Sequence, residues 1–102
     1  MLAASPTLAS AEAAHIDLPA SFDFTSSAKF RVPFVQLLND PATDRIVLNL
    51  SAVDYVDSCG IGTLVAWHKF CEERGKEMVV RNCNDKVLRL FKVLSVDRLF
   101  NF

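Results

Sequence analysis

The stretch IVLNLSAVDYVDSCGIGTLVAWHKFC, residues 46–71, decides the fold of this chain. It opens with an apolar run, Ile46 to Leu50, that is too short for a lone helix and begins with β-branched residues, as a strand covered on both faces does. It closes with side chains at the three- and four-residue spacing of one helix face, namely Ile61, Leu64, Val65, His68 and Cys71. The sequence therefore predicts a strand, a short polar loop and then a helix.

The loop between these two elements, residues 51–58, ends where the helix begins. Its last part, Asp57 to Gly60, lies where the unpaired N–H groups and the positive end of the helix dipole are exposed. A serine hydroxyl here is presented at the surface, beside donors that can hold a phosphate. Ser58 is therefore a candidate modification site. Its simpler role is that of an N-cap, which stabilises a helix by about 1 kcal/mol relative to alanine.

Length and composition predict one soluble, globular domain. A chain of 102 residues can bury a usable core without disulfide or metal cross-links. Hydrophobic residues make up 51% of it, which is too many for a disordered protein. A net charge of −1 gives no field that would attract nucleic acid or an anionic membrane surface. Three cysteines without a zinc or disulfide spacing favour a reducing compartment, so we expect a cytoplasmic protein.

The N-terminal region divides at about residue 15. Residues 1–14 are rich in Ala and Ser with little to bury, and we expect a flexible arm there, with an Ala-rich helix as the alternative. The domain proper should span residues 15–102 and open with an alternating pattern, typical of a strand that is at the sheet edge or bent at Pro19. This single strand leaves either an exposed sheet edge or a place for a strand from the arm.

A first helix is expected to follow and to end near Leu38. Its candidate N-caps are Thr25, Ser26 and Ser27. Pro33 would remove a hydrogen bond and cost about 3 kcal/mol inside a helix, so the helix is either kinked there or begins near Arg31. The side chains that should face inward are Phe30, Phe34, Leu37 and Leu38.

The rest of the chain predicts a strand, a helix and an apolar tail. Arg74 and Gly75 form a typical helix C-terminus, and residues 78–80 follow as a strand. A last helix should run from about residue 86 to residue 94, and residues 96–102 should form a short strand or a tail docked on the core. The buried face of that helix should carry Val87, Leu90, Phe91 and Leu94. Strands that alternate with helices imply right-handed crossovers and a mainly parallel sheet.

The central stretch resembles the signature of the STAS domain, the family of bacterial anti-sigma factor antagonists. The resemblance lies in an apolar strand, an acidic-Ser-x-Gly-apolar-Gly motif at residues 57–62 and an amphipathic helix, and it extends more loosely over residues 17–102. It implies a single α/β domain with a mostly parallel central sheet of about four strands and about three helices. Cys59 departs from the family pattern, which has a second serine there. The family also has two antiparallel strands before its first helix, whereas this sequence predicts one.

Ser58 matches the serine that is phosphorylated in family members that switch partners. The resemblance implies a protein that acts by binding and not as an enzyme: unphosphorylated, it would engage an anti-sigma factor that is also a serine kinase. Phosphorylation would add roughly −1.5 to −2 charges beside Asp57 and expel that partner, and a serine phosphatase would reset the switch. The alternative is a constitutive subunit of a cytoplasmic complex that supports a lipid-transport ABC system.

Two aromatic side chains on the central helix point to a binding surface. If Leu64 and His68 face inward, Phe70 points away from the core and Trp67 lies at its border. Exposed aromatics beside a switch loop favour partner binding, and a weak homodimer contact or cover by the arm are the alternatives. We predict a partner-binding surface made of Asp23, Asp57, Ser58, Cys59, Gly60, Trp67 and Phe70.

Other polar groups have simpler explanations than catalysis. Asp54, Asp57 and Asp23 could form a metal site or an acid/base pair, but loop aspartates more commonly bond to nearby backbone. Cys59, at a helix N-terminus, is either a reactive thiolate suited to redox sensing or a small packed residue. His68 should be a packed side chain, and no catalytic set can be assembled around it. We therefore expect no metal and no cofactor.

Two further patterns carry little weight. Gly60 and Gly62 lack the third glycine or the lysine of a nucleotide-binding loop, and we expect them to let the helix approach the sheet closely. Lys86, Arg89 and Lys92 form a basic row, which we interpret as a solvated helix face, with partner docking as the less favoured role.

Overall fold

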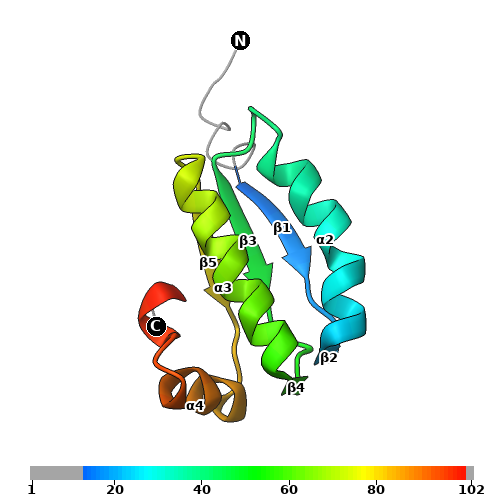
Figure 1. The fold of residues 1–102 in the computed structure, drawn as a ribbon, viewed down its shortest axis with the longest axis vertical. Coiled ribbons are helices and arrows are strands. Elements are labelled where there is room, and N and C mark those ends of the chain that lie inside the picture. Colours follow the sequence, from blue (N-terminus) through cyan, green and yellow to red (C-terminus); the bar gives the residue numbers. More distant parts are fainter. Residues whose placement is uncertain (1–12, 101–102) are drawn as a thin grey trace.

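The apolar run at the start of the deciding stretch forms β3 (Arg45–Asn49), the middle strand of a three-stranded sheet in the order β1-β3-β5 (Figure 1). β1 (Ala13–Asp17) and β5 (Glu77–Arg81) both run parallel to β3. Ile46 and Leu48 are fully buried, as expected for a central strand. The predicted parallel sheet is confirmed.

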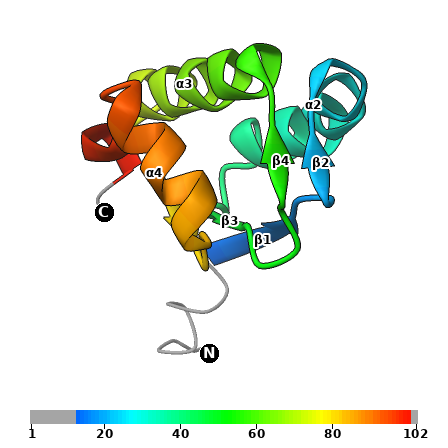
Figure 2. The ribbon, with the colours of Figure 1, turned by 90° about the horizontal axis from the view of Figure 1, so that it is seen from below.

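A second, smaller sheet continues from the ends of these strands. β2 (Ser21–Phe22) pairs in parallel with β4 (Tyr55–Val56), and the two lie at the carboxyl end of the larger sheet (Figure 2). The expected sheet of about four strands is therefore divided into one of three strands and one of two. In the described part of the chain, two strands precede α2 (Phe24–Leu38), but they belong to different sheets and do not form an antiparallel pair.

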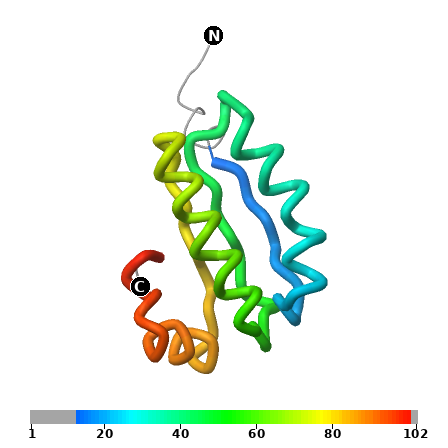
Figure 3. The backbone as a smooth tube through the Cα atoms, viewed as in Figure 1, coloured from blue at the N-terminus to red at the C-terminus, as the bar shows by residue number. Residues whose placement is uncertain are grey.

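Two long helices cover one face of the larger sheet (Figures 1 and 2). They are α2 (Phe24–Leu38) and α3 (Ser58–Glu73), and each follows a strand along the chain path (Figure 3). α4 (Asp85–Val93) lies beyond the carboxyl end of β5, and a short 3₁₀ helix, η1 (Asp97–Phe100), completes the fold. No helix in the described part of the chain is long and apolar enough to cross a membrane.

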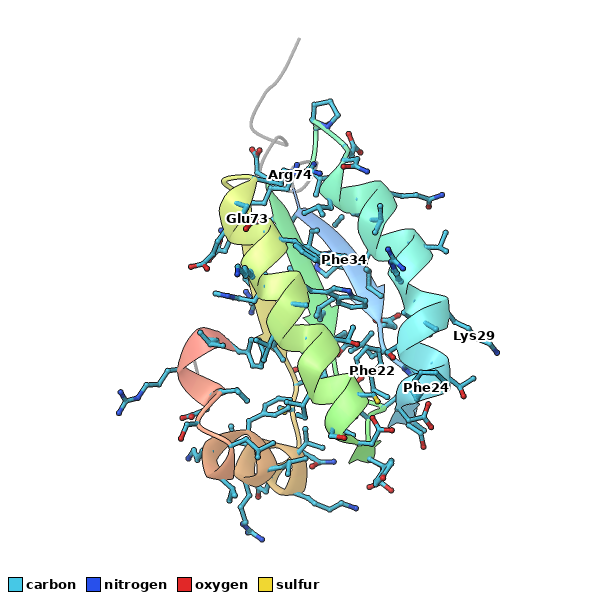
Figure 4. All side chains as sticks on the ribbon, viewed as in Figure 1. Phe22, Phe24, Lys29, Phe34, Glu73 and Arg74 are labelled. Carbon is cyan, nitrogen blue, oxygen red and sulfur yellow. The ribbon has the colours of Figure 1, made fainter. Side chains whose placement is uncertain are left out.

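Aromatic side chains hold the two long helices together. Phe34 of α2 stacks on Trp67 of α3 with ring centroids 4.2 Å apart, and Phe22 meets the edge of the same indole at 5.8 Å. Figure 4 shows Phe22 and Phe34 between the helices and the sheet. Stacked and edge-on ring pairs each contribute about 0.5–1.5 kcal/mol beyond their buried area. Trp67 is therefore the side chain through which α3 packs against α2 and β2.

The first helix begins earlier than the cap candidates predicted. Asp23 is its N-cap, so Thr25 and Ser26 lie inside the first turn. The helix also passes through Pro33 without ending, because Phe34 and Leu38 are buried beyond the proline and hold the last turn against the core. Of the four side chains expected to face inward, Phe34 and Leu38 are buried, whereas Phe30 and Leu37 are partly exposed.

The C-terminal region differs from its prediction in two ways. Leu94 is 48% exposed, because α4 ends at Val93 and the chain turns at Ser95, which has a positive φ of 60°. The tail is the 3₁₀ helix η1 and not a strand, although Phe100 docks in the core against Phe91 at a ring distance of 5.4 Å. A docked apolar tail, the other expectation, is confirmed.

The N-terminal boundary is only partly open to comparison. The structure, a computed structural model, describes residues 13–100. Within this part, β1 begins at Ala13, two residues before the domain boundary expected from the sequence, and its only neighbour in the sheet is β3. The predicted arm otherwise falls on residues 1–12, which lie outside the described residues, and so does the question of a strand supplied by it.

Candidate functional site

Asp57 joins the N-termini of the two long helices. Its carboxylate Oδ1 accepts a hydrogen bond from the N–H of Gly60 at 2.7 Å and caps α3. Its Oδ2 accepts from the N–H of Phe24, in the first turn of α2, at 3.2 Å. One side chain thus satisfies an unpaired donor on each helix. The N-cap of α3 is therefore Asp57, and the capping role considered for Ser58 is wrong.

Ser58 is left as the first residue of α3 with an exposed side chain. Within residues 13–100, its hydroxyl makes no hydrogen bond. The neighbouring carboxylate of Asp57 is engaged in the caps, so the Ser58 hydroxyl is open to solvent and no hydrogen bond within residues 13–100 holds it. It lies at a helix N-terminus, where a phosphate is favoured by the backbone dipoles.

Asp23 organises the adjacent turn at the start of α2. Its Oδ1 accepts from the Ser26 N–H at 3.1 Å, and the Asp23 N–H donates to Ser26 Oγ at 2.9 Å, which is a complete capping box. The hydrogen bonds from Ser26 hold the pKa of the Asp23 carboxyl below its usual value. Because the next residue, Phe24, bonds to Asp57, the structure brings the predicted residues Asp23, Asp57 and Ser58 together.

The two glycines of the motif have different roles. A Cβ on Gly60 would lie 2.1 Å from the backbone oxygen of Phe22 and 2.9 Å from a methyl carbon of Val56, so only glycine allows α3 to approach β2 and β4 here. A Cβ on Gly62 would meet nothing within 4 Å. Close approach of the helix, predicted for both, is confirmed for Gly60 and wrong for Gly62. Gly60 is buried and cannot itself touch a partner.

Trp67 does not lie where the helical pattern predicted. It is 3% exposed and stacked on Phe34, so its prediction as an exposed aromatic is wrong. The physical reason is that α3 packs against both the sheet and α2, which makes its buried arc wider than one apolar stripe. Phe70 is 45% exposed, as predicted. Sequence reasoning missed Phe24, which is 70% exposed and donates its N–H to Asp57. Figure 4 shows its side chain at the start of α2.

Phe24, Trp67 and Phe70 line a groove of about 490 Å³ between α2 and α3, which we call the α2/α3 groove. Exposed Phe24 and Phe70 contribute to its walls, and the largely buried Trp67 reaches its floor. Its other lining residues are Ser27, Ala28, Arg31, Cys59, Gly62, Thr63 and Ala66. The groove is mainly apolar and runs from the start of α3 along the surface, so it provides contact area next to Ser58.

The three thiols differ in exposure, and His68 is packed against its neighbours. Cys59 is exposed, whereas burial raises the pKa of both Cys71 and Cys83 to about 11. His68 packs edge-on against Phe100 and lies 3.8 Å from a carboxylate oxygen of Glu72, as expected for a packed side chain. Within residues 13–100, no three His, Cys, Asp or Glu side chains are placed to hold a metal ion.

The curated relatives of this chain that follow are both named as anti-sigma factor antagonists. The anti-sigma F factor antagonist of Paenibacillus polymyxa is 26% identical over 87 residues, which cover 79% of this chain and 74% of that protein. The anti-sigma-B factor antagonist of Staphylococcus aureus is 30% identical over 64 residues, covering 63% of this chain and 59% of that protein. The second match therefore spans less than two thirds of its relative.

Solved structures share the fold at lower identity. The phosphorylated form of SpoIIAA, a Bacillus cell fate determinant, has a TM-score of 0.69 at 17% identity, covering 87% of this chain and 80% of that one. A sulfate transporter family protein from Wolinella succinogenes has a TM-score of 0.77 at 13% identity, covering 87% and 71%. The same fold thus occurs in a regulator and in a transporter family protein.

The family itself is established by a match over nearly the whole sequence. The model of the STAS domain matches residues 8–102. It includes the strand, the capped loop and the helix whose geometry is described above. This chain therefore belongs to the STAS domain family.

Proposed function

We propose that this protein is an anti-sigma factor antagonist whose binding to an anti-sigma factor is controlled by phosphorylation of Ser58. One observation carries the proposal: the Ser58 hydroxyl is exposed and without a hydrogen bond within residues 13–100, while its acidic neighbour Asp57 is held by two. The names of the curated relatives support the antagonist function, and one structural neighbour, SpoIIAA, was solved in a phosphorylated form.

In the unphosphorylated state, the partner docks over the start of α3 and along the α2/α3 groove. Asp23 and Asp57 make this end of the surface acidic, and Phe24 and Phe70 offer exposed aromatic area. Aromatic side chains, Phe included, are enriched in protein–protein interfaces relative to the rest of the surface. In this proposal Cys59 contributes to the contact, whereas the buried Gly60 and Trp67 hold the surface in shape from beneath.

Phosphorylation changes the surface and leaves the fold intact. A phosphate on Ser58 brings roughly −1.5 to −2 charges next to Asp57. The dipole of α3 offsets part of that repulsion within the domain, because the phosphate lies at the positive end of the helix. A partner that approaches the same spot meets both the extra charge and the extra volume, and it is expelled.

The partners supply the chemistry. A serine kinase that is also the anti-sigma factor transfers the phosphate, and a serine phosphatase removes it. This chain contributes the hydroxyl and the docking surface, and its proposed place of action is the cytoplasm. The alternative is a constitutive subunit of a complex that supports a lipid-transport ABC system.

Phosphopeptide mapping tests the proposal. The protein is incubated with ATP and an extract of its source cells, next to the variants Ser58→Ala and Ser51→Ala. Ser51 is the matched control, because it is an exposed serine of the same loop whose hydroxyl makes no hydrogen bond within residues 13–100. We expect one phosphate, on Ser58, that is absent only from Ser58→Ala. No phosphate, in an extract that modifies other proteins, would overturn the switch.

Partner retrieval separates the switch from the constitutive subunit. Wild type, Ser58→Asp and Ser51→Asp are immobilised, and the bound proteins are identified by mass spectrometry. A kinase-type anti-sigma factor that is lost only with Ser58→Asp supports the switch. Components of a lipid transporter that bind all three variants equally support the alternative.

A further inference from the structure

A second groove lies on the opposite flank of the loop that carries Ser58. It has a volume of about 430 Å³ and is formed by the end of that loop, β4 and α4, whose arrangement Figure 2 shows. Its lining residues are Asp54, Tyr55, Val56, Lys86, Val87, Arg89, Leu90 and Val93. We call it the β4/α4 groove. The surface around Ser58, which comprises Asp23, Asp57, Ser58 and the α2/α3 groove, is called the Ser58 surface, and it shares no lining residue with the β4/α4 groove.

The groove has an apolar interior that is left open. Val56 and Val87 are buried at its base, and Leu90 is partly exposed above them. Val93 on one wall is 74% exposed and Tyr55 on the other is 54% exposed. Side chains of this size lose favourable burial when they remain in water, by about 25 cal/mol for each Å². Two of them facing one hollow therefore indicate a surface that gains from being covered.

The charges at the rim are mainly positive. Lys86 and Arg89 share one helix face with Leu90 and Val93, because their spacing follows the helical repeat. Lys86 meets Asp54 at 3.4 Å, but both side chains are largely exposed, so the pair is weak. Arg89 forms no ion pair with any of residues 13–100. Arg89 is therefore available to an incoming carboxylate, and Lys86 becomes available once its weak pair with Asp54 opens.

We propose that the β4/α4 groove is a second docking site, which takes a protein segment with an apolar ridge flanked by carboxylates. The apolar interior fits the ridge, and Lys86 and Arg89 fit the carboxylates. A flat anionic membrane would match the charges but could not fill a concave surface. The end of the α2/α3 groove beside Ser58 carries the carboxylates of Asp23 and Asp57, so an acidic segment is favoured at the β4/α4 groove and not at that end.

A random peptide library displayed on phage tests this assignment. Selection is performed on the folded wild-type domain, and the selected peptides are compared with the unselected library. We expect enrichment of Asp and Glu together with Leu, Ile or Phe, and amide shifts on binding that map to residues 54–56 and 86–93. Selected peptides with no acidic excess, or with shifts elsewhere, would contradict the proposal.

Charge reversal gives a quantitative test with a matched control. For one selected peptide, measured by fluorescence anisotropy, Lys86→Glu with Arg89→Glu should weaken binding by about tenfold or more. Lys29→Glu with Lys69→Glu makes the same change in net charge at exposed sites outside the groove and should leave binding unchanged. Equal weakening by both pairs would mean that only net charge matters and would overturn the site.

Two further measurements test whether a membrane occupies the β4/α4 groove and whether the peptide binds at the Ser58 surface instead. Vesicles of phosphatidylglycerol should not compete with the peptide, because competition would assign the surface to a membrane. Ser58→Asp should leave peptide binding unchanged, since the β4/α4 groove does not depend on the switch. Loss of peptide binding in that variant would place the peptide on the Ser58 surface and overturn the second site.

Discussion

The two flanks of the loop at residues 51–57 are built in opposite ways. On the flank that faces α2 and α3, the polar groups are engaged internally: Asp57 bonds to both helices, and Asp23 forms a capping box. On the flank that faces α4, one weak ion pair joins Asp54 to Lys86, and Asn84 donates from its side chain to the backbone oxygen of Val53 at 3.0 Å. The carboxylates of the first flank are thus bonded to backbone N–H groups, whereas the charged groups of the second flank are joined by one exposed ion pair.

This difference bears on what each flank can do. The proposed switch needs a hydroxyl on a backbone that is held in place, and the first flank offers one, because Asp57 bonds to the starts of both helices while the Ser58 hydroxyl makes no hydrogen bond within residues 13–100. Recognition of an unmodified partner needs free charges and open apolar area, which the α4 flank provides. Removing a buried or hydrogen-bonded side chain should therefore lower the unfolding free energy markedly, whereas removing an exposed one should change it little.

The largest effect is expected from Trp67→Ala. The indole is stacked on Phe34 and 3% exposed, so its removal leaves a cavity between α2 and α3 and should cost about 3–5 kcal/mol of unfolding free energy. Urea denaturation followed by circular dichroism measures it. The control is Phe70→Ala, also on α3 but 45% exposed, where a loss within about 0.5 kcal/mol is expected. Equal losses would mean that Trp67 does not hold the helices together.

A smaller but clear contrast is expected between Gly60→Ala and Gly62→Ala. The first places a methyl group 2.1 Å from a backbone oxygen and should destabilise the domain by about 1–3 kcal/mol or more. The second meets open space within a helix and should stabilise it by about 0.5–1 kcal/mol. Thermal unfolding measures both. A destabilised Gly62→Ala would contradict the assigned roles.

Much of the fold could be predicted from sequence because its signals are local. The apolar run of β3, the stop at Gly75 with a φ of 69°, and the alternation of strands and helices each follow from short-range periodicity and turn chemistry. The extra parallel pair of β2 and β4 could not be predicted, since it depends on two-residue strands brought together by the rest of the fold.

The position of the site at a helix N-terminus was predicted from the sequence, whereas its capping residue and the burial of Trp67 were not. The motif placed Asp57 and Ser58 at a helix N-terminus, but it could not show which of the two caps the helix. That choice depends on Phe24, which is far away in sequence and supplies the second donor to Asp57. Trp67 was misplaced in the same way, because a helix that contacts two neighbours buries more than one stripe.

Asp57→Ala should have a moderate effect. It removes the cap of α3 and the link to the Phe24 N–H, and about 1–2 kcal/mol of stability should be lost. Chemical denaturation measures the loss, and Asp57→Asn, which keeps one oxygen acceptor, should recover part of it. On the other flank, Asp54→Ala removes only an exposed ion pair and should change stability by less than about 0.5 kcal/mol. Similar losses of stability in Asp54→Ala and Asp57→Ala would mean that the two flanks do not differ in how their carboxylates are engaged.

The smallest effect is expected from the titration of Asp23. Its pKa is lowered in the folded protein by the hydrogen bonds from Ser26, so the carboxylate form binds the native state better. The resulting stability is present above the unfolded pKa, at about pH 4, and is lost as the pH falls through the folded pKa. Asp23→Asn keeps a capping oxygen but does not titrate, so the stability difference between wild type and this variant should shrink as the solution is acidified.

Urea midpoints at a series of pH values from neutral to acid measure this difference. Asp54→Asn is the control on the other flank. Within residues 13–100 Asp54 accepts no backbone N–H, and its one ion pair is exposed, so at neutral pH Asp54→Asn should lower the urea midpoint by less than Asp23→Asn does. A larger loss from Asp54→Asn than from Asp23→Asn would mean that the rim charges of the α4 flank, and not the caps beside Ser58, are the ones committed to the fold. The assignment of a fixed switch flank and an available docking flank would then have to be reversed.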